Sequence, residues 1–160
     1  MSERPHVIGL VSDTHGLVRH DVHTALEGVS LILHAGDVGG DEVLDELALI
    51  APVMAVCGNT DAPGDPRLKA VIELEAAGLT IHVSHGHELG SPTPEKLLAA
   101  YSAEVIVYGH THRALVTRAD GRLVVNPGAA GPRRFDLKPS VARLTIAAGR
   151  AEVEIVGLES

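Results

Sequence analysis

The 160-residue chain has little cysteine and few aromatic residues, and both shortages exclude particular functions. Its one cysteine, Cys57, rules out a disulfide within the chain and gives no support to a zinc site built from cysteines. Tryptophan is absent, and Tyr101, Tyr108 and Phe135 are the only other large aromatic residues. We therefore expect a core of Val, Leu, Ile and Ala, with no aromatic platform on which nucleic-acid bases could stack.

The chain also lacks a basic stripe and a long apolar run. Its formal charge is −8 and its pI is about 5.6, so we expect no electrostatic binding of extended nucleic acid. No stretch is long enough to span a bilayer, and the N-terminal residues show no apolar signal region. We therefore expect a cytoplasmic protein that does not associate with membranes. An acidic protein that handles phosphate needs a local positive source, which bound cations would supply.

The order of apolar runs and turns predicts one α/β domain over residues 1–160. We expect helices over residues 21–27, 41–50 and 94–101, with Asp41 and Thr93 as N-caps of the last two. The expected strands are residues 7–12, 31–34, 53–57, 71–74, 80–84, 105–108, 115–118, 123–125, 141–147 and 151–156. Parallel strands need cover on both faces, and the closing hairpins can form a second sheet. We therefore predict two packed mixed β-sheets flanked by helices.

Five of the apolar runs end in a polar side chain of a type that binds metal ions. These residues are Asp13, Asp37, Asn59, His85 and His110, with His112 two positions beyond the last. In open α/β sheets, ligands bind beyond the carboxyl ends of the strands. Strands of a single sheet would bring these side chains to one edge, so we expect a metal site there.

The residue types indicate which metals would bind. Carboxylate, amide oxygen and imidazole together suit Mn, Fe, Zn or Ni better than Ca or Mg. Asp13-x-His15 and His110-x-His112 each place two ligand types on one short segment. The two oxygens of Asp37 can bridge two ions, which would clamp the attacking and leaving oxygens of a phosphate. Two divalent ions opposite two carboxylates leave a positive site, which complements a hydroxide and a phosphodiester monoanion.

The ordered combination of motifs resembles the calcineurin-like metallophosphoesterases, in particular the small bacterial YfcE-like phosphodiesterases. The resemblance runs from about Val7 to Arg133 and rests on Asp13-x-His15, Gly36-Asp37, Gly58-Asn59-Thr60-Asp61, His85-Gly86-His87, Gly109-His110-Thr111-His112 and Asn126-Pro127-Gly128. It implies a four-layer αββα sandwich. It also implies a metallophosphoesterase that hydrolyses a small phosphodiester or phosphomonoester.

The resemblance further implies roles for individual residues. One metal ion would be held by Asp13, His15, Asp37 and His112, and the second by Asp37, Asn59, His85 and His110, with Asp37 as the bridge. A hydroxide bridging the two ions would attack phosphorus in line with the leaving oxygen. The catalytic set would be Asn59, His87 and Asp61, where the first two stabilise developing charge and Asp61 orients a neighbouring ligand. Manganese is the expected metal, with Fe, Ni and Zn as alternatives.

Thr60 departs from the family pattern, because many members have a histidine there that stabilises or protonates the leaving group. A threonine hydroxyl is a very poor acid at neutral pH, so we expect slower turnover of substrates with poor leaving groups. Other roles stay open. His34 is either a supporting residue or a satisfied core histidine, and Arg113, Arg133 and Arg134 are either phosphate ligands or exposed cations.

Two other classes of function stay open. The retromer scaffold subunit has a similar fold, has lost ligands and works by protein binding; such a role predicts weak metal binding and a large exposed apolar patch. A dinuclear metallohydrolase could instead cleave a thioester or an amide. The chain retains every ligand expected of the family, which favours a phosphoesterase. A homo-oligomer paired through the terminal hairpin is also compatible with the sequence.

Overall fold

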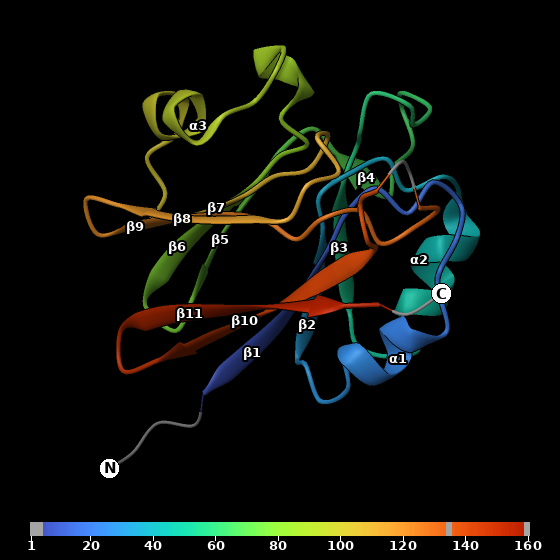
Figure 1. Ribbon diagram of the computed structural model, residues 1–160, viewed down its shortest axis with the longest axis horizontal. Coiled ribbons are helices and arrows are strands. Elements are labelled where there is room, and N and C mark those ends of the chain that lie inside the picture. The colour runs from blue at the N-terminus through green and yellow to red at the C-terminus, as the bar shows by residue number, and fades with distance from the viewer. Residues whose placement is uncertain (1–4, 134–135, 159–160) are drawn as a thin grey trace.

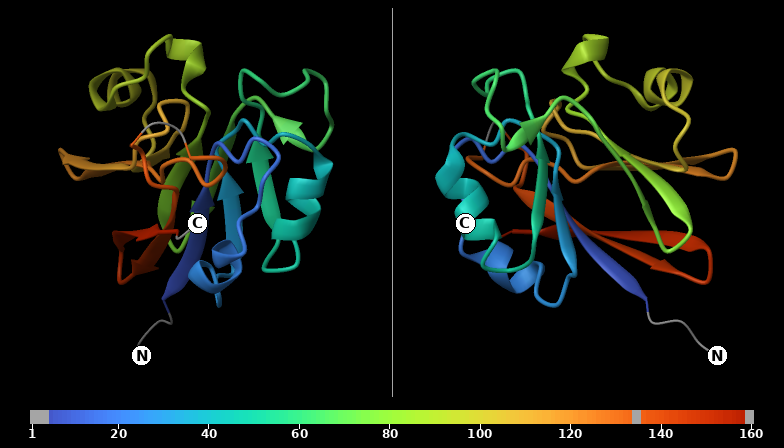
Figure 2. Two further views of the ribbon diagram at one scale, coloured as in Figure 1. Left: turned by 45° about the vertical axis from the view of Figure 1, so that its right-hand side comes forward. Right: turned by 180° about the vertical axis from the view of Figure 1, so that it is seen from behind.

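Two β-sheets pack face to face, with helices on their outer faces (Figures 1 and 2). The structure is a computed structural model that describes residues 5–133 and 136–158. The first sheet has the strand order β11-β10-β1-β2-β3-β4. Its strands are β1 (His6–Val11), β2 (Leu31–His34), β3 (Val53–Val56), β4 (Leu68–Lys69), β10 (Ser140–Ala147) and β11 (Arg150–Gly157). Strands β1 to β4 run parallel, whereas β10 is antiparallel to both of its neighbours.

The second sheet has the strand order β5-β6-β7-β9-β8 and is also mixed. Its strands are β5 (Ile72–Ala76), β6 (Leu79–Val83), β7 (Val105–Val107), β8 (Leu115–Ala119) and β9 (Arg122–Asn126). Strands β6, β7 and β9 run parallel, and the antiparallel strands β5 and β8 form the two edges. The prediction of two packed mixed sheets is therefore confirmed.

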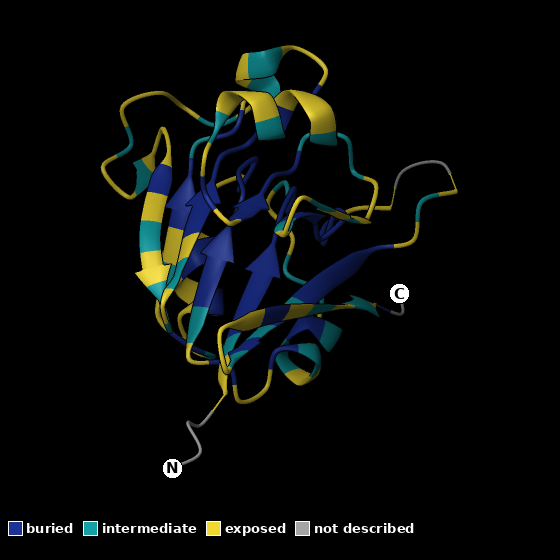
Figure 3. Ribbon diagram, turned by 90° about the vertical axis from the view of Figure 1, so that its left-hand side faces the viewer, coloured by how far each residue is buried: buried dark blue, intermediate teal, exposed yellow. Residues whose placement is uncertain are grey.

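Side-chain alternation along the strands builds the four layers. In β1, Ile8 and Leu10 pack in the core between the sheets, while Val11 packs in the core beneath helices α1 (Asp21–Ala25) and α2 (Asp41–Leu47). In β7, the inner residues face the first sheet, and Ile106 packs with Leu97 of helix α3 (Pro94–Ala100) on the outside. Figure 3 shows the central strands buried and exposed residues on α3 and the loops. Within residues 5–133 and 136–158, no helix is long and apolar enough to cross a membrane.

Some local expectations were wrong. Gly40, and not Asp41, is the N-cap of α2, and no side chain caps this helix. The short strand β4 and the 3-10 turn η1 (His87–Leu89) were not predicted, because they lie in loops rich in glycine, proline and charged residues. The terminal hairpin β10–β11 does not join the second sheet. It extends the first, where β10 pairs with β1 over residues 6–10 and so covers an edge of the parallel strands.

The carboxyl ends of β1, β2, β3, β6 and β7 all lead toward one end of the sandwich (Figure 2). The sequence predicts that these ends share one sheet edge, and this is wrong. The first three strands belong to one sheet and the last two to the other. The loops that follow them therefore face one another across the top of the core, because the two sheets are packed together.

Candidate metal centre

Five residues of metal-ligand type have left-handed backbone conformations. They are Asp13 (φ 54°), His15 (φ 46°), Asp37 (φ 55°), His110 (φ 72°) and His112 (φ 64°). Such a conformation is uncommon outside glycine and costs about 1–3 kcal/mol per residue when tertiary structure imposes it. The remaining non-glycine residues of this kind in the described ranges lie in β-hairpin turns. The strain outside the hairpins is thus concentrated where the strand ends meet, which is typical of a functional site.

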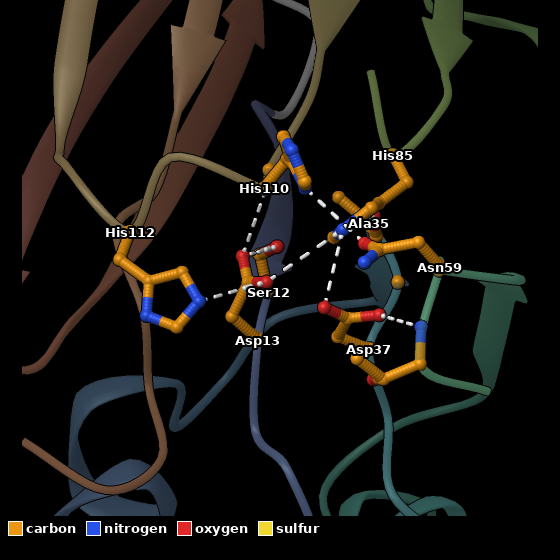
Figure 4. Close-up of polar contacts among 12 residues, drawn as sticks. Ser12, Asp13, Ala35, Asp37, Asn59, His85, His110 and His112 are labelled. Atoms are coloured by element: carbon orange, nitrogen blue, oxygen red, sulfur yellow. Dashed lines mark hydrogen bonds and ion pairs between the residues drawn. The ribbon is translucent and has the colours of Figure 1, made fainter. Parts of the chain in front are cut away.

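Asp13, His15 and His112 form a first group, whose ligand atoms lie within 4.8 Å of one another; Figure 4 shows Asp13 and His112 of this group. Asp13 Oδ1 is 3.4 Å from His112 Nε2 and 3.8 Å from His15 Nε2. The two imidazole Nε2 atoms are 3.4 Å apart. Asp37 Oδ2 approaches the same group and lies 3.7 Å from His15 Nε2. These are the four side chains expected for one of the two metal ions.

Asp37 and His85 form a second group with Asp13, again with ligand atoms within 4.8 Å of one another. His85 Nε2 is 3.3 Å from Asp37 Oδ2 and 3.8 Å from Asp13 Oδ1. Its Nδ1 lies 2.8 Å from the carbonyl oxygen of Ala35, which can only accept, so Nδ1 carries the proton. This hydrogen bond leaves Nε2 directed at the two carboxylates.

Asn59 and His110 complete the cluster on the side away from His112. Asn59 Oδ1 lies 3.2 Å from His110 Nδ1. The His110 ring stands edge-on to the His85 ring, with centroids 5.2 Å apart. The structure thus brings the seven predicted metal ligands together, since His110 also contacts Asp13 through its backbone amide.

The charges at the centre of the cluster depend on one another. Burial by itself would raise the pKa of Asp37, but the contact with His85 and the hydrogen bond from the Thr60 amide hold it well below its ordinary value. Burial likewise opposes ionisation of Asp13, and its contacts with His112 and Ser12 lower its pKa. Burial would lower the pKa of His85, yet the two carboxylates raise it. Two ionised carboxylates in this cluster therefore need a nearby positive charge.

A divalent cation fits this requirement. Asp13 Oδ1 and His85 Nε2 are buried, lack a hydrogen-bond partner and lie 3.8 Å apart. Buried polar atoms without partners are costly, and a native protein retains them where they have another role. A carboxylate oxygen and an imidazole nitrogen directed at the same space are ligands of the kind that Mn, Fe, Zn and Ni accept. The donor set therefore fits metal ions.

Neighbouring groups fix the orientation of Asp13. Ser12 Oγ donates to Asp13 Oδ2 at 2.5 Å, and the backbone amide of His110 donates to the same oxygen at 3.1 Å. Oδ2 is thereby engaged, while Oδ1 faces His112 and His85. Sequence reasoning missed Ser12, although its position directly before a buried aspartate is the signal that could have identified it.

Asp61 ties two ligand loops together. Its carboxylate accepts from the amides of Val38 at 3.1 Å, Gly39 at 3.1 Å and Gly58 at 2.9 Å. These amides belong to the loop after Asp37 and to the turn before Asn59. Both carboxylate oxygens of Asp61 are thereby engaged by the loops that carry Asp37 and Asn59.

Thr60 contacts the cluster, whereas the structure shows of the arginines only that two of the three are exposed. The Thr60 side chain is exposed, but its backbone amide donates to Asp37 Oδ1 at 2.9 Å, a contact that sequence reasoning missed. Arg113 follows the ligand His112 directly and is exposed, as is Arg133. Arg134 lies outside the described residues.

His34 connects two ligand loops from beneath and is completely buried. Thr14 donates its hydroxyl proton to the carbonyl oxygen of Val38 at 2.7 Å, so the 2.9 Å contact with His34 Nε2 requires an Nε2 proton. His34 Nδ1 accepts from the Gly36 amide at 3.0 Å. The neutral ring therefore satisfies both nitrogens and joins the loop of Asp13 to that of Asp37. It fits both roles left open for it, a satisfied core histidine and a support for the site.

Acidification from pH 7 to pH 5 is expected to destabilise the metal-stripped protein by about 2 kcal/mol through His34 alone. Burial lowers the pKa of His34 to about 4 from 6.5, although the nearby carboxylates of Asp13, Asp61 and Asp37 oppose this shift. The unfolded chain therefore binds the proton first as the pH falls. The stabilisation is complete above the unfolded pKa and is lost between pH 6.5 and about 4. Urea unfolding at the two pH values measures it.

The matched pair of variants is His34→Gln and His20→Gln, since His20 is exposed. The pH-dependent loss should shrink by about 2 kcal/mol in His34→Gln and persist in His20→Gln. An unchanged pH dependence in His34→Gln would contradict the assignment of a neutral buried ring.

His87 lies on η1 beside the cluster. Its ring centroid is 5.3 Å from that of His85 and 6.3 Å from that of His110, and its buried Nδ1 lacks a hydrogen-bond partner. Glu88 fixes this turn, because it accepts from the Gly86 amide at 3.0 Å and from the Tyr101 hydroxyl at 2.7 Å. Burial and Glu88 raise the pKa of Tyr101 to about 12, so this donor stays protonated at physiological pH.

Comparisons with known proteins agree with this geometry. A profile of the calcineurin-like phosphoesterase superfamily domain matches residues 7–149. A probable metallophosphoesterase of Methanothermobacter thermautotrophicus is 31% identical over 159 residues, which cover 94% of this chain and 91% of the relative. A phosphodiesterase of Methanocaldococcus jannaschii is 28% identical, with 76% of this chain and 82% of the relative covered.

The fold is shared more widely than the sequence. Vacuolar Protein Sorting 29 from Cryptosporidium parvum superposes with a TM-score of 0.80 at 20% identity, and the match covers 99% of this chain and 100% of that chain. At this identity the likeness concerns the fold alone. The profile match spans all of the candidate metal ligands, from Asp13 to His112. The chain belongs to the calcineurin-like phosphoesterase superfamily.

Proposed function

We propose that the chain is a metal-dependent phosphodiesterase that uses two divalent ions, with manganese as the working metal and Fe, Ni or Zn as alternatives. One observation carries the proposal. The carboxylates of Asp13 and Asp37 converge with His85 on a buried space, where Asp13 Oδ1 and His85 Nε2 have no hydrogen-bond partner. That donor set suits transition metals.

The two ions would have separate ligands and a shared carboxylate. In this proposal Asp13, His15, Asp37 and His112 hold one ion, and Asp37, Asn59, His85 and His110 hold the other. The short distances from Asp37 Oδ2 to both His15 Nε2 and His85 Nε2, 3.7 and 3.3 Å, support the bridging role. Bound ions would supply Lewis acidity and a water of lowered pKa.

The chain's own residues would then orient the substrate and manage its charge. Asn59 borders the cluster from an exposed position, where its amide can contact a phosphoryl oxygen. His87 carries an unpartnered buried Nδ1 near His85 and His110. It would hold a proton for the leaving oxygen, the role that a histidine at position 60 has in many relatives. Glu88 and Tyr101 would keep its turn in place.

A diester is the favoured substrate on grounds of charge and similarity. A diester carries one negative charge and a monoester at neutral pH nearly two. A net positive site facing a hydroxide has room for one further negative charge. The phosphodiesterase of Methanocaldococcus jannaschii, which is similar over 76% of this chain, supports the same choice.

Replacement of His87 by alanine is expected to slow the hydrolysis of diphenyl phosphate by about 100-fold and that of bis(p-nitrophenyl) phosphate by only a fewfold. Phenolate is the poorer leaving group and needs the proton more. The measurement is kcat for both diesters, with His20→Ala as the control histidine. Equal losses for the two substrates would contradict a leaving-group role.

The proposed function is tested by metal-stripped protein titrated with Mn²⁺ during hydrolysis of bis(p-nitrophenyl) phosphate. We expect activity that saturates near two equivalents of metal. Tight metal binding without hydrolysis of any phosphoester would favour a hydrolase of thioesters or amides. Absence of metal binding would favour a protein-binding role. The described surface gives little support to that role, since Leu49 is its only large hydrophobic residue more than half exposed, at 79%.

A further inference from the structure

A cavity of about 550 Å³ opens beside the ligand His112. It lies between α3, the start of β8 and the segment before β10, and Thr111, His112 and Arg113 form its border with the metal centre. Its volume is in the range of pockets that bury small ligands. A group attached to a phosphate at the metal centre can therefore enter it directly.

The walls of this cavity are mainly apolar. The apolar contributors are Pro92, Pro94, Tyr108, Ala114, Leu115 and Leu137. The half-buried ring of Pro94 offers apolar surface against which another ring can pack, whereas Pro92 and Tyr108 are themselves buried. The charged residues are two cations, Arg113 and Lys138, and one anion, Asp136, all of them exposed. The cavity therefore suits a ring that carries a negatively charged substituent.

A second cavity, of about 560 Å³, lies on the opposite side of the cluster and has the opposite charge. It is bordered by Asn59 and His87, and its only acidic or basic residues besides that histidine are Asp61 and Glu88. Two carboxylates without a compensating Lys or Arg disfavour an anionic group. The metal centre thus lies between a cationic apolar cavity and an acidic one, which gives a diester two distinguishable sides.

We propose that the cavity beside His112 binds one ester arm of the substrate, and that this arm is an aromatic ring with a further anionic group. The assignment rests on the proposed function and deepens it by naming a substrate class. Leu115 and Pro94 contact the ring, and Lys138 and Arg113 attract the anionic group. The second ester arm lies toward Asn59 and His87.

Competitive inhibition by phosphates that carry a single ester group tests the assignment. Such a compound has no second ester group that could leave or occupy the cavity instead. The inhibitors are methyl phosphate, phenyl phosphate and 4-carboxyphenyl phosphate, measured against Mn²⁺-dependent hydrolysis of bis(p-nitrophenyl) phosphate. We expect the inhibition constant of phenyl phosphate to be about tenfold lower than that of methyl phosphate, because the ring is buried. The carboxylate should lower it by about a further fivefold, as an exposed ion pair does.

Two variants and a matched control locate the effect. Leu115→Asp should remove the preference for the ring, and Lys138→Glu should remove the preference for the carboxylate. Val71→Asp is the control, because Val71 lines the opposite cavity and has the same exposure as Leu115, 40% against 39%. Circular dichroism confirms that each variant folds.

The outcomes separate this assignment from the proposed function. Equal inhibition constants for all three phosphates, or losses caused by Val71→Asp instead of Leu115→Asp, would overturn the assignment and leave the phosphodiesterase standing. Failure of the protein to hydrolyse any diester with Mn²⁺ would overturn both.

Discussion

Asp37→Asn is expected to lower Mn²⁺-dependent phosphodiesterase activity by on the order of 10³-fold, a loss of about 4 kcal/mol of transition-state stabilisation. The substitution keeps the size of the side chain and removes its charge. Asp37 Oδ2 lies nearer than the Asp13 carboxylate to both His15 Nε2 and His85 Nε2, and Asp37 Oδ1 is held by the Thr60 amide. An amide in this place offers one neutral oxygen where two ions would share a carboxylate. Calorimetric titration should show the loss of at least one equivalent of bound metal.

Asp120→Asn is the matched control for this variant. Asp120 has nearly the same left-handed backbone, φ 53° against 55° for Asp37, and lies exposed in the β8–β9 turn. Asparagine tolerates this conformation, so both substitutions are neutral for the backbone. Activity of Asp120→Asn should stay within about twofold of wild type. Comparable activity of the two variants would show that the charge of Asp37 is dispensable and would contradict a metal-bridging role.

Much of the fold could be predicted because local patterns decide it. The alternation in residues 7–11 places Ile8 and Leu10 on one face of β1, and Thr93 followed by Pro94 marks the start of α3, where Thr93 Oγ1 accepts from the Lys96 amide. The pairing of strands that lie far apart in the sequence was harder to predict. The pattern of residues 141–147 predicts a strand, but its pairing with β1 depends on which sheet edge remains open.

The ligands of the candidate site were predicted from the sequence, and so was a supporting position for Asp61, but two other supports were missed. Asp13 and His85 belong to motifs with fixed spacing, so the sequence alone singles them out. Ser12 and Thr60 support the site through a hydroxyl and a backbone amide, and such contacts depend on how two loops meet. The sequence also did not show that two sheets share the site, because the residues at the end of a strand do not reveal which sheet contains that strand.

Gly58→Ala is expected to lower diesterase activity by about 100-fold, because a displacement near 1 Å at a reacting group has effects of this size. Gly58 does not have a positive φ, so alanine is compatible with its backbone. The new Cβ atom, however, would overlap Asp37 Oδ1 and the Asp37 amide. The carboxylate must shift away from His85, or the turn that carries Asn59 must move. Overpacking of this kind costs about 1–3 kcal/mol of stability as well.

Gly157→Ala provides the matched control, since Gly157 also lacks a positive φ and a Cβ atom there would meet no atom within 4 Å. Its activity and thermal midpoint should stay at wild-type values. The comparison separates two requirements at the centre, because Asp37→Asn removes the charge in place whereas Gly58→Ala keeps the charge and moves it. If Gly58→Ala bound metal and turned over diesters like Gly157→Ala, the position of Asp37 would not matter, and the close packing of its loop against Gly58 would have no catalytic purpose.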